Sequence, residues 1–439
     1  MAAKPKIVWM KTQWKYRNNP FPSNGIAVLG GEDNRENGLL FQPQVQWEKV
    51  QEVNEKFILG AAYSGLKFGY LWSLGGGLAG DQRGFGKSSL LQYMVEQVNH
   101  DFGHSFMMQA GLEEADADEE PICAVLASFD MANARSLAAV FFEATRYACR
   151  FRVGDGPTLA ARLYDRLVAK LGTNEPAVLQ ASVMGVWDNM RGRTIGPPIN
   201  ELVRLLCAGD QIQLGRFIDS VKEGARGRVS AANYFATFLL FAKAAGIPHV
   251  ILGCDQLEDF AATSTTRQKR ATEVERFRDY VLELQPMADM LCVVVTLHPR
   301  AQQAIHDMWR LADLPDPAPD RVENQSRVVI LEAIEDLDRA KALLLPYLQE
   351  ARNVQVAPSD QFAPFTEEAI QVLLNRSDGK PRDLLRKAHA LFEQGAEHNW
   401  AQIDGQHAAD VLDSLSTPED EAAPSVTART NSLEDLWTY

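Results

Sequence analysis

The chain has 439 residues, of which 46% are hydrophobic and 23% are charged, proportions that are ordinary for a globular protein. A chain of this length can bury a sizeable core and suggests two or three domains. The formal net charge of −14 excludes a generic polyanion binder, so any contact with nucleic acid would need a local basic patch.

The cysteines are scattered, odd in number and mostly placed inside apolar runs. This pattern favours buried free thiols in a reducing cytoplasm over a disulfide framework or a zinc site. The first residues have no long apolar stretch, and no apolar run reaches membrane-spanning length. We therefore expect a cytoplasmic protein without membrane contact. The five cysteines are Cys123, Cys149, Cys207, Cys254 and Cys292.

The first quarter of the chain alternates between loop-like and regular patterns. Residues 1–43 are rich in Asn, Gly and Pro and predict an N-terminal arm of extended or loop structure. Residues 44–60 have a helical pattern, and residues 67–76 (KFGYLWSLGG) predict a buried strand that runs into glycines. A glycine-containing loop follows, and then a helix from about Lys87 to His100.

The middle of the chain continues this alternation. Residues 121–130 (PICAVLASFD) predict a second strand, and residues 136–151 (SLAAVFFEATRYACRF) predict the helix after it. Residues 155–245 are mostly helical in pattern. Residues 249–260 (HVILGCDQLEDF) predict a short strand that ends in an acidic cluster, and a polar, charged helix follows over about 264–285.

Two more strands are predicted, over DMLCVVVTLHP (289–299) and SRVVILEAI (326–334). Residues from about 335 to 415 are helical in pattern and predict a separate lid-like domain over 331–415. The tail, 416–439, has the composition of a flexible linker, and its last residues, LEDLWTY, could form a docking segment.

Strands that alternate with helices predict an α/β fold with a parallel sheet, covered by helices and binding ligands at the carboxyl ends of its strands. We therefore expect an α/β core over 44–330, with a helical insertion at about 155–245.

Residues 80–89 (GDQRGFGKSS) are similar to the phosphate-binding pattern G-x-x-x-x-G-K-[ST], with Asp81 in place of the first glycine. The glycines would let the backbone aim N–H groups at phosphate oxygens. Lys87 would neutralise the β- and γ-phosphates, and the Ser88 hydroxyl would bind Mg²⁺. The alternative is a surface turn ahead of a helix. The predicted nucleotide-binding residues are Gln82, Arg83, Gly84, Phe85, Gly86, Lys87, Ser88 and Ser89.

A second acidic position is needed if the nucleotide is hydrolysed, because an acid at the end of a neighbouring strand holds Mg²⁺. Asp255 follows an apolar strand and is the predicted second magnesium residue beside Ser88. Glu258 would polarise the attacking water, although Gln256 could position it by hydrogen bonding. The alternative is a strand that simply ends in solvated acids. Because the usual Asp-Glu pair is here Asp-Gln, slow hydrolysis or a nucleotide switch stays open.

With these motifs in place, the chain resembles the AAA+ ATPases, and within them the origin-recognition/Cdc-type and transposition-helper branch. YRNNPFP (16–22) is similar to the segment that packs near the adenine, which implies that Pro20 and Phe21 contact the base. MLCVVVTLHPR is similar to the strand that carries the sensor-1 residue, which implies Thr296 beside the γ-phosphate, with His298 as the alternative.

The same resemblance implies two arginines. DRVENQSRVVIL is similar to the arginine-finger segment, which makes Arg321 the residue that acts on a neighbouring subunit's nucleotide. FTEEAIQVLLNRSDGKPRDLLRKAHALF is similar to the lid helices, in which Gly-x-Pro-Arg carries the sensor-2 arginine, here Arg382. Positioned positive charge of this kind stabilises phosphoryl transfer. Alternatives to Arg321 are Arg327, Arg300 and Arg310.

Together these features predict a subunit that binds ATP and Mg²⁺, forms a homo-oligomer or part of a multi-subunit complex, and acts on nucleic acid or recruits a partner to it. Defence, replication-initiation and transposition systems use such subunits. The alternative is a nucleotide-dependent scaffold or signalling switch with little turnover; a polypeptide-threading remodeller is disfavoured because no pore-loop pattern is evident. Basic residues that could meet nucleic acid, or simply form solvated ion pairs, are Arg191, Arg193, Arg226, Arg228, Arg267, Lys269, Arg270, Arg276 and Arg278.

Overall fold

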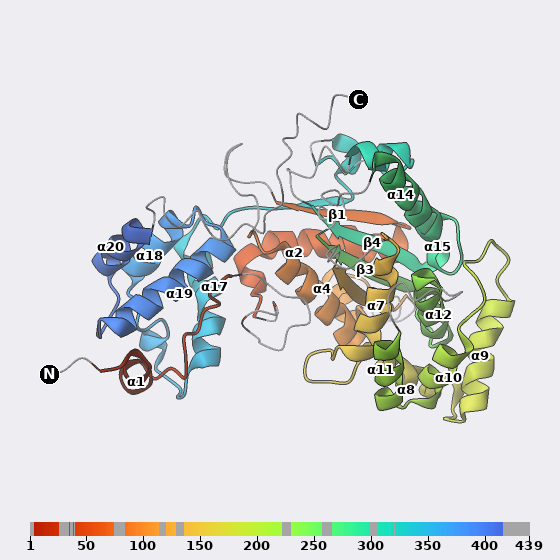
Figure 1. The fold of residues 1–439 in the computed structure, drawn as a ribbon, viewed down its shortest axis with the longest axis horizontal. Helices are drawn as coiled ribbons and strands as arrows, with labels where there is room; N and C mark the ends of the chain where they lie inside the picture. The colour runs from red at the N-terminus through yellow and green to blue at the C-terminus, as the bar shows by residue number, and fades with distance from the viewer. Residues whose placement is uncertain are drawn as a thin grey trace. The chain divides into compact units, whose positions relative to one another are not determined.

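A computed structural model gives the fold (Figure 1). Contacts within the chain divide it into two compact units, which we describe separately. The helical unit comprises Met1–Gly25 and Ile334–Tyr439, and the sheet unit comprises Ile26–Ala333. The structure describes residues 4–25, 35, 38, 40–73, 84–113, 120–128, 136–221, 230–256, 266–297, 306–315, 317–319 and 321–415.

The sheet unit is built on five parallel strands in the order β2-β3-β4-β1-β5. This confirms the predicted α/β class with a parallel sheet, and each predicted strand is present. The order places β1 between β4 and β5, so the chain after β1 and the chain after β4 leave in opposite directions. Ligands of open parallel sheets bind where connections diverge in this way. The strands are β1 (Phe68–Ser73), β2 (Ile122–Ser128), β3 (His249–Asp255), β4 (Leu291–Thr296) and β5 (Val328–Leu331).

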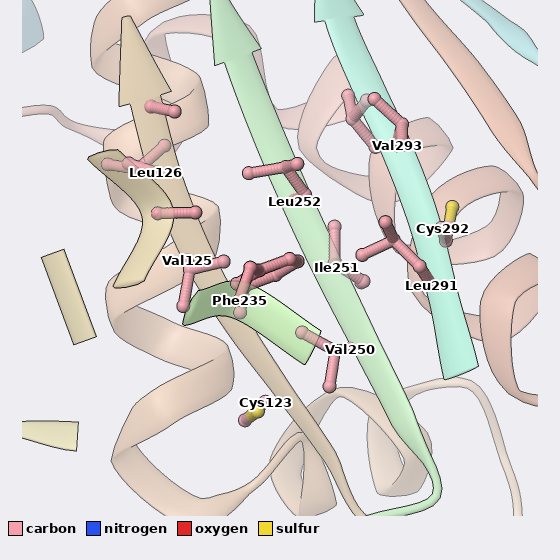
Figure 2. Close-up of a cluster of buried hydrophobic side chains, with 14 of the residues drawn as sticks. Cys123, Val125, Leu126, Phe235, Val250, Ile251, Leu252, Leu291, Cys292 and Val293 are labelled. Carbon is pink, nitrogen blue, oxygen red and sulfur yellow. The ribbon is translucent and has the colours of Figure 1, made fainter. Parts of the chain in front are cut away.

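The core of the sheet unit lies on both faces of these strands. Nearly every strand residue is buried, as expected for a parallel sheet that helices cover on two sides. Figure 2 shows Val125 of β2, Leu252 of β3 and Val293 of β4 within a cluster of buried hydrophobic side chains, in which Phe235 of helix α12 lies beside Val125. Burial raises the pKa of the Cys123 thiol to about 12. All five cysteines are buried free thiols, as predicted.

The register of the strands brings three carboxyl ends to one level. Cys254 of β3 pairs with Val295 of β4, and Leu71 of β1 pairs with Thr296. Because parallel neighbours end together, Asp255, Thr296 and the end of β1 lie at the same edge of the sheet. This edge is the candidate site.

Helices before and after β1 complete this part of the sheet unit. The chain enters α4 through Gly86 and leaves it at Phe102, both with left-handed backbone angles that begin and end the helix sharply. The helices are η2 (Pro43–Gln46), α2 (Trp47–Val53), η3 (Asn54–Ile58), α3 (Leu59–Tyr63), α4 (Lys87–Asp101) and α5 (His104–Gln109).

A set of helices stands between β2 and β3, as the predicted insertion requires. In Figure 1, α8 to α11 gather beyond α7 and α12, away from the strands. Stacked rings of Phe141 on α7 and Phe235 on α12, with centroids 5.8 Å apart, join the two helices. These helices are α7 (Ala139–Arg150), α8 (Leu159–Leu171), α9 (Pro176–Asp188), α10 (Asn200–Ala208), α11 (Gln211–Ser220) and α12 (Ala231–Ala244); α14 (Arg267–Leu282), α15 (Met287–Met290) and η4 (Val322–Asn324) follow later.

The helical unit combines the C-terminal helices with the first residues of the chain. Its core is aromatic: the ring of Phe392 lies 4.7 Å from that of Trp14 and 5.1 Å from that of Tyr16. The Trp14 indole N–H donates to the carbonyl of Trp400 at 3.1 Å. The elements are α1 (Lys6–Trp9), η1 (Met10–Trp14), α17 (Leu337–Ala351), η5 (Pro358–Asp360), α18 (Glu367–Arg376), α19 (Pro381–Glu397) and α20 (Gly405–Leu415).

Residues 6–14 are therefore helical, which differs from the extended or loop structure expected for this segment. The reason is long-range packing: Trp14 and Tyr16 insert against α19, and local composition carries no sign of that partner. The domain limits named from the sequence stay predictions. Among the described residues, no helix combines the length and apolar character needed to cross a bilayer.

Candidate functional site

The described part of the predicted phosphate loop forms a tight turn into a helix. Gly84 and Gly86 have φ angles of 92° and 87°, a region in which any side chain would be strained. The carbonyl of Gly86 accepts from the N–H of Leu90 at 2.8 Å, so Lys87, Ser88 and the residues after them form the first turn of α4. The free N–H groups of such a turn attract anions. Gln82 and Arg83 lie outside the described residues, as does Asp81.

Lys87 is buried at the base of this turn, with 8% of its surface exposed. Its amine donates to the hydroxyl of Ser73, the last residue of β1, at 2.8 Å. A buried ammonium group needs polar partners, and the Ser73 hydroxyl supplies one at the carboxyl edge of the sheet. Lys87 is thereby placed beside the end of β1, and its predicted contact with phosphate stays a prediction.

Asp255, the last residue of β3, connects the start of α4 to the end of β4. The hydroxyl of Ser88 donates to its Oδ2 at 2.7 Å, and the hydroxyl of Thr296 donates to its Oδ1 at 2.6 Å. Asp255 is 4% exposed, so its carboxylate is almost fully removed from water. The structure thus brings Ser88, Asp255 and Thr296, which are far apart in the sequence, into one hydrogen-bonded group.

These residues fit a hard divalent cation. Within the described residues, no Lys, Arg or His lies within 4 Å of the Asp255 carboxylate, so its negative charge is balanced only by hydroxyl dipoles there. A buried carboxylate in that state gains from a cation. The Ser88 hydroxyl donates a hydrogen bond to Asp255, and its oxygen still has lone pairs that can bind a metal. Mg²⁺ prefers oxygen ligands. The donor set therefore suits Mg²⁺.

Thr296 also fixes the residue that follows Asp255. Its hydroxyl accepts from the N–H of Gln256 at 3.1 Å while it donates to Asp255. Gln256 has a φ of 61°, which is uncommon for a residue with a side chain and is found at sites that hold a functional geometry. In this structure Thr296 therefore positions Asp255 and Gln256. Its predicted contact with the γ-phosphate stays a prediction.

Other predicted catalytic residues of the sheet unit are less tied to this group. Arg321 is exposed and lies 3.4 Å from the carboxylate of Glu323. Of its alternatives, Arg327 lies just before β5, where its carbonyl accepts from the N–H of Tyr70. Glu258, His298 and Arg300 lie outside the described residues. The role of each stays a prediction.

The residues predicted to meet the base and the γ-phosphate from the lid lie in the helical unit. Phe21 is 1% exposed, and its ring lies 5.9 Å from that of Phe365 and 6.2 Å from that of Phe392. Pro20 is buried beside it. The Arg382 guanidinium donates to the carbonyl of Asn24 at 3.3 Å, so it neighbours the same N-terminal segment. Phe21 has a clear role in the core of this unit, and the nucleotide contacts of Pro20, Phe21 and Arg382 stay predictions.

Two residues of the site were not singled out from the sequence. One is Ser73, which meets Lys87; its only sequence signal is its place at the end of a strand before glycines. The other is Gln46, which is buried and donates to the carbonyls of Phe85 at 3.4 Å and Glu332 at 3.2 Å. Gln46 thus supports the phosphate loop from outside. Gln46 lies 39 residues before Phe85 in the sequence, so no local pattern could predict this contact.

Several of the basic residues considered for nucleic-acid contact have acidic neighbours. Arg193 lies 3.0 Å from Glu283, and Arg276 lies 3.0 Å from Glu273. Arg278 lies 2.6 Å from Asp279. These exposed pairs favour the interpretation as a solvated, charge-balanced surface.

Comparison with known proteins does not assign this chain to a family. No protein-family model and no curated protein matches the chain. Among solved structures, the chain is similar to the Aeropyrum pernix ORC2 protein, determined as ADPNP-ADP complexes. The TM-score is 0.40 and the identity 10%, over 90% of this chain and 71% of that one. At this level of similarity, function has to be argued from the residues of the site.

Proposed function

We propose that the sheet unit binds ATP with Mg²⁺ and hydrolyses it, and that the chain is a subunit of the AAA+ type. The observation that carries the proposal is the 2.7 Å hydrogen bond between Ser88, at the start of α4, and Asp255, at the end of β3. It joins a turn suited to phosphate with a buried carboxylate suited to a cation. A chance glycine turn on the surface would have no reason to meet such a carboxylate.

Each of these residues would have a distinct role in binding the nucleotide or the metal. The N–H groups after Gly84 and the N-terminus of α4 would bind the phosphates, and the Lys87 amine would move from Ser73 to the β- and γ-phosphate oxygens. Mg²⁺, held by Ser88 and Asp255, would supply charge neutralisation on those oxygens. Thr296 would keep Asp255 in place through its hydroxyl.

The attacking water would be positioned by Gln256 or by Glu258. Gln256 is fixed by Thr296 at the carboxyl end of β3, in a strained backbone conformation that such a role would justify. A glutamine can orient water by hydrogen bonding but cannot take its proton as a carboxylate can. Arg382, and Arg321 of a neighbouring copy, would add positive charge in the transition state.

Within this proposal the subunit oligomerises, by itself or in a complex, and acts on nucleic acid or brings a partner to it. The buried free thiols fit a reducing, cytoplasmic setting. The second candidate is a nucleotide-dependent scaffold or switch with little turnover, and the glutamine at position 256 is the observation that favours it. Phosphate release measured on the oligomer distinguishes the two.

Calorimetric titration with ATP and Mg²⁺ tests the proposal. The unaltered protein should bind one ATP per chain, and Lys87→Ala should weaken binding by about a hundredfold, because a charge-assisted contact to phosphate is lost. Lys243→Ala is the matched control, since that lysine is partly exposed on α12 and its loss should leave affinity unchanged. Equal affinity of Lys87→Ala and the unaltered protein would contradict the proposal.

A further inference from the structure

A cavity lies at the opposite edge of the sheet from the candidate site. It has a volume of about 500 Å³, which is in the range of small-molecule sites. It lies beside Phe68, the first residue of β1, whereas the candidate site lies beside Ser73, the last. At the rise of a strand, the two are separated by about 17 Å. We call it the amino-edge cavity; it is lined by Glu55, Lys56, Gly60, Ser64, Gly65, Leu66, Lys67, Phe68, Leu282, Pro315, Ser326 and Arg327.

The charged lining of the amino-edge cavity is mostly positive. Lys56, Lys67 and Arg327 face a single lining carboxylate, that of Glu55. Lys56 is neutralised outside the lining, because its amine lies 2.9 Å from Glu52. Among the described residues, neither Lys67 nor Arg327 has a carboxylate within 4 Å. Within the described part of the chain, the cavity therefore holds two cations that form no direct ion pair.

The two cations are held in place and incompletely satisfied. The carbonyl of Lys67 accepts from Val293 of β4, and that of Arg327 accepts from Tyr70 of β1, so both backbones are anchored to the sheet. The Lys67 amine donates to the carbonyl of Ala288 at 2.6 Å, and burial lowers the pKa of Lys67. The Nε–H of Arg327 is buried and has no hydrogen-bond partner among the described residues. An unmet buried donor costs free energy that a bound acceptor would recover.

The rest of the lining suits an organic ligand. The partly exposed side chains of Leu66 and Pro315 supply an apolar wall, and Ser64 and Ser326 are also part of the lining. Gly65 has a φ of 62°, and a Cβ there would meet nothing within 4 Å, so the backbone beside the cavity stays open to a ligand. This combination of an apolar wall and a few placed polar groups is typical of small-molecule sites.

We propose that the amino-edge cavity binds a small organic anion, with a phosphate or carboxylate group at Lys67 and Arg327 and an apolar ring against Leu66 and Pro315. The site is separate from the candidate nucleotide site and does not depend on the function proposed for it. Arg327 suits this role because its planar guanidinium pairs with carboxylate or phosphate through two N–H groups.

The test is a calorimetric titration of the full chain with 1-naphthyl phosphate and, separately, 1-naphthoate, each with ATP and Mg²⁺ present to fill the phosphate loop. At least one probe should bind at one site per chain, and the tighter probe identifies the head group. Arg327→Gln should weaken binding by about tenfold or more, because a charge-assisted pair is lost. Lys87→Ala should leave it unchanged.

A matched pair of variants guards against a folding defect in Arg327→Gln. Leu282 lies at the cavity wall with 36% of its surface exposed, so substitutions there should fold. Leu282→Glu should weaken binding about fivefold by repulsion, whereas Leu282→Gln should stay within about twofold of the unaltered protein. Absence of saturable binding for both probes overturns the proposal. So does equal binding by Leu282→Glu and Leu282→Gln, or loss of binding in Lys87→Ala.

Discussion

The carboxyl edge of the sheet and the aromatic core of the helical unit differ in how far a short stretch of sequence determines them. At the sheet edge, a glycine turn, a lysine and a strand-ending aspartate come together because parallel strands end at one level. In the helical unit, Phe21 was expected to contact adenine, yet its ring is buried among Phe365 and Phe392. The position of a motif residue can be predicted where local backbone geometry fixes it. It cannot be predicted where the residue packs against a distant part of the chain.

The largest expected effect concerns the carboxylate at the sheet edge. Asp255→Asn keeps the shape of the side chain but removes the charge that would hold Mg²⁺, so turnover should fall by about a hundredfold or more. Phosphate release at saturating ATP measures this. Asp219→Asn is the control, because that aspartate forms an exposed ion pair with Arg150 on the insertion helices. Unchanged turnover in Asp255→Asn would show that this residue has no part in catalysis.

The next prediction addresses the helical unit. Phe392 contacts Trp14, Tyr16 and Phe21, so Phe392→Ala should lower the free energy of unfolding of this unit by about 3–5 kcal/mol. Denaturant unfolding followed by circular dichroism measures the change. Val354→Ala, at a position 50% exposed in the same unit, should change it by less than about 0.5 kcal/mol. Similar losses in both variants would show that the aromatic cluster is not the core of the unit.

At Thr296, one hydroxyl connects two residues of the site. Thr296→Val is nearly isosteric but removes the hydrogen bonds to Asp255 and Gln256, so turnover should fall by about tenfold. The Mg²⁺ concentration for half-maximal turnover should rise, which loss of a phosphate contact alone would not cause. Thr296→Ser keeps the hydroxyl and should therefore restore most of the turnover and most of the response to Mg²⁺. If Thr296→Ser is as impaired as Thr296→Val, the hydroxyl is not the group that matters.

The smallest expected effect is at Ser73. Its hydroxyl stabilises the Lys87 amine before nucleotide binds, and nucleotide would displace that bond. Ser73→Ala should therefore destabilise the nucleotide-free protein by about 1 kcal/mol and tighten ATP binding by up to about fivefold. Thermal unfolding and calorimetry measure the two changes. Weaker ATP binding in Ser73→Ala would show that Ser73 acts in the bound state instead.

Much of the sheet unit could be predicted from the sequence because its signals are local. The short apolar run VILGC before Asp255 is typical of a buried strand, and Gly84 and Gly86 permit the left-handed backbone that the turn requires. The placement of Ser88, Asp255 and Thr296 at one edge follows from parallel pairing. The roles of these residues, by contrast, stay predictions until a nucleotide is bound.

The remaining features depend on contacts between distant parts of the chain. Residues 6–14 are helical because Trp14 packs on Phe392, almost four hundred positions away along the 439-residue chain. Gln46 supports Phe85, and Ser73 meets Lys87, through side-chain geometry that no periodicity records. Thr296 was expected to face phosphate, and its hydrogen bonds to Asp255 and Gln256 became visible only with the strands in register.

The most direct test of the central claim is a crystal structure of the protein with a non-hydrolysable ATP analogue and Mg²⁺. We expect the β- and γ-phosphates inside the turn at Gly84–Ser88, the Lys87 amine moved from Ser73 to phosphate oxygens, and the Ser88 oxygen about 2.1 Å from Mg²⁺. Asp255 should remain hydrogen-bonded to Ser88, on the metal's side of the site. A nucleotide bound elsewhere, or a metal that contacts neither Ser88 nor the surroundings of Asp255, would contradict it.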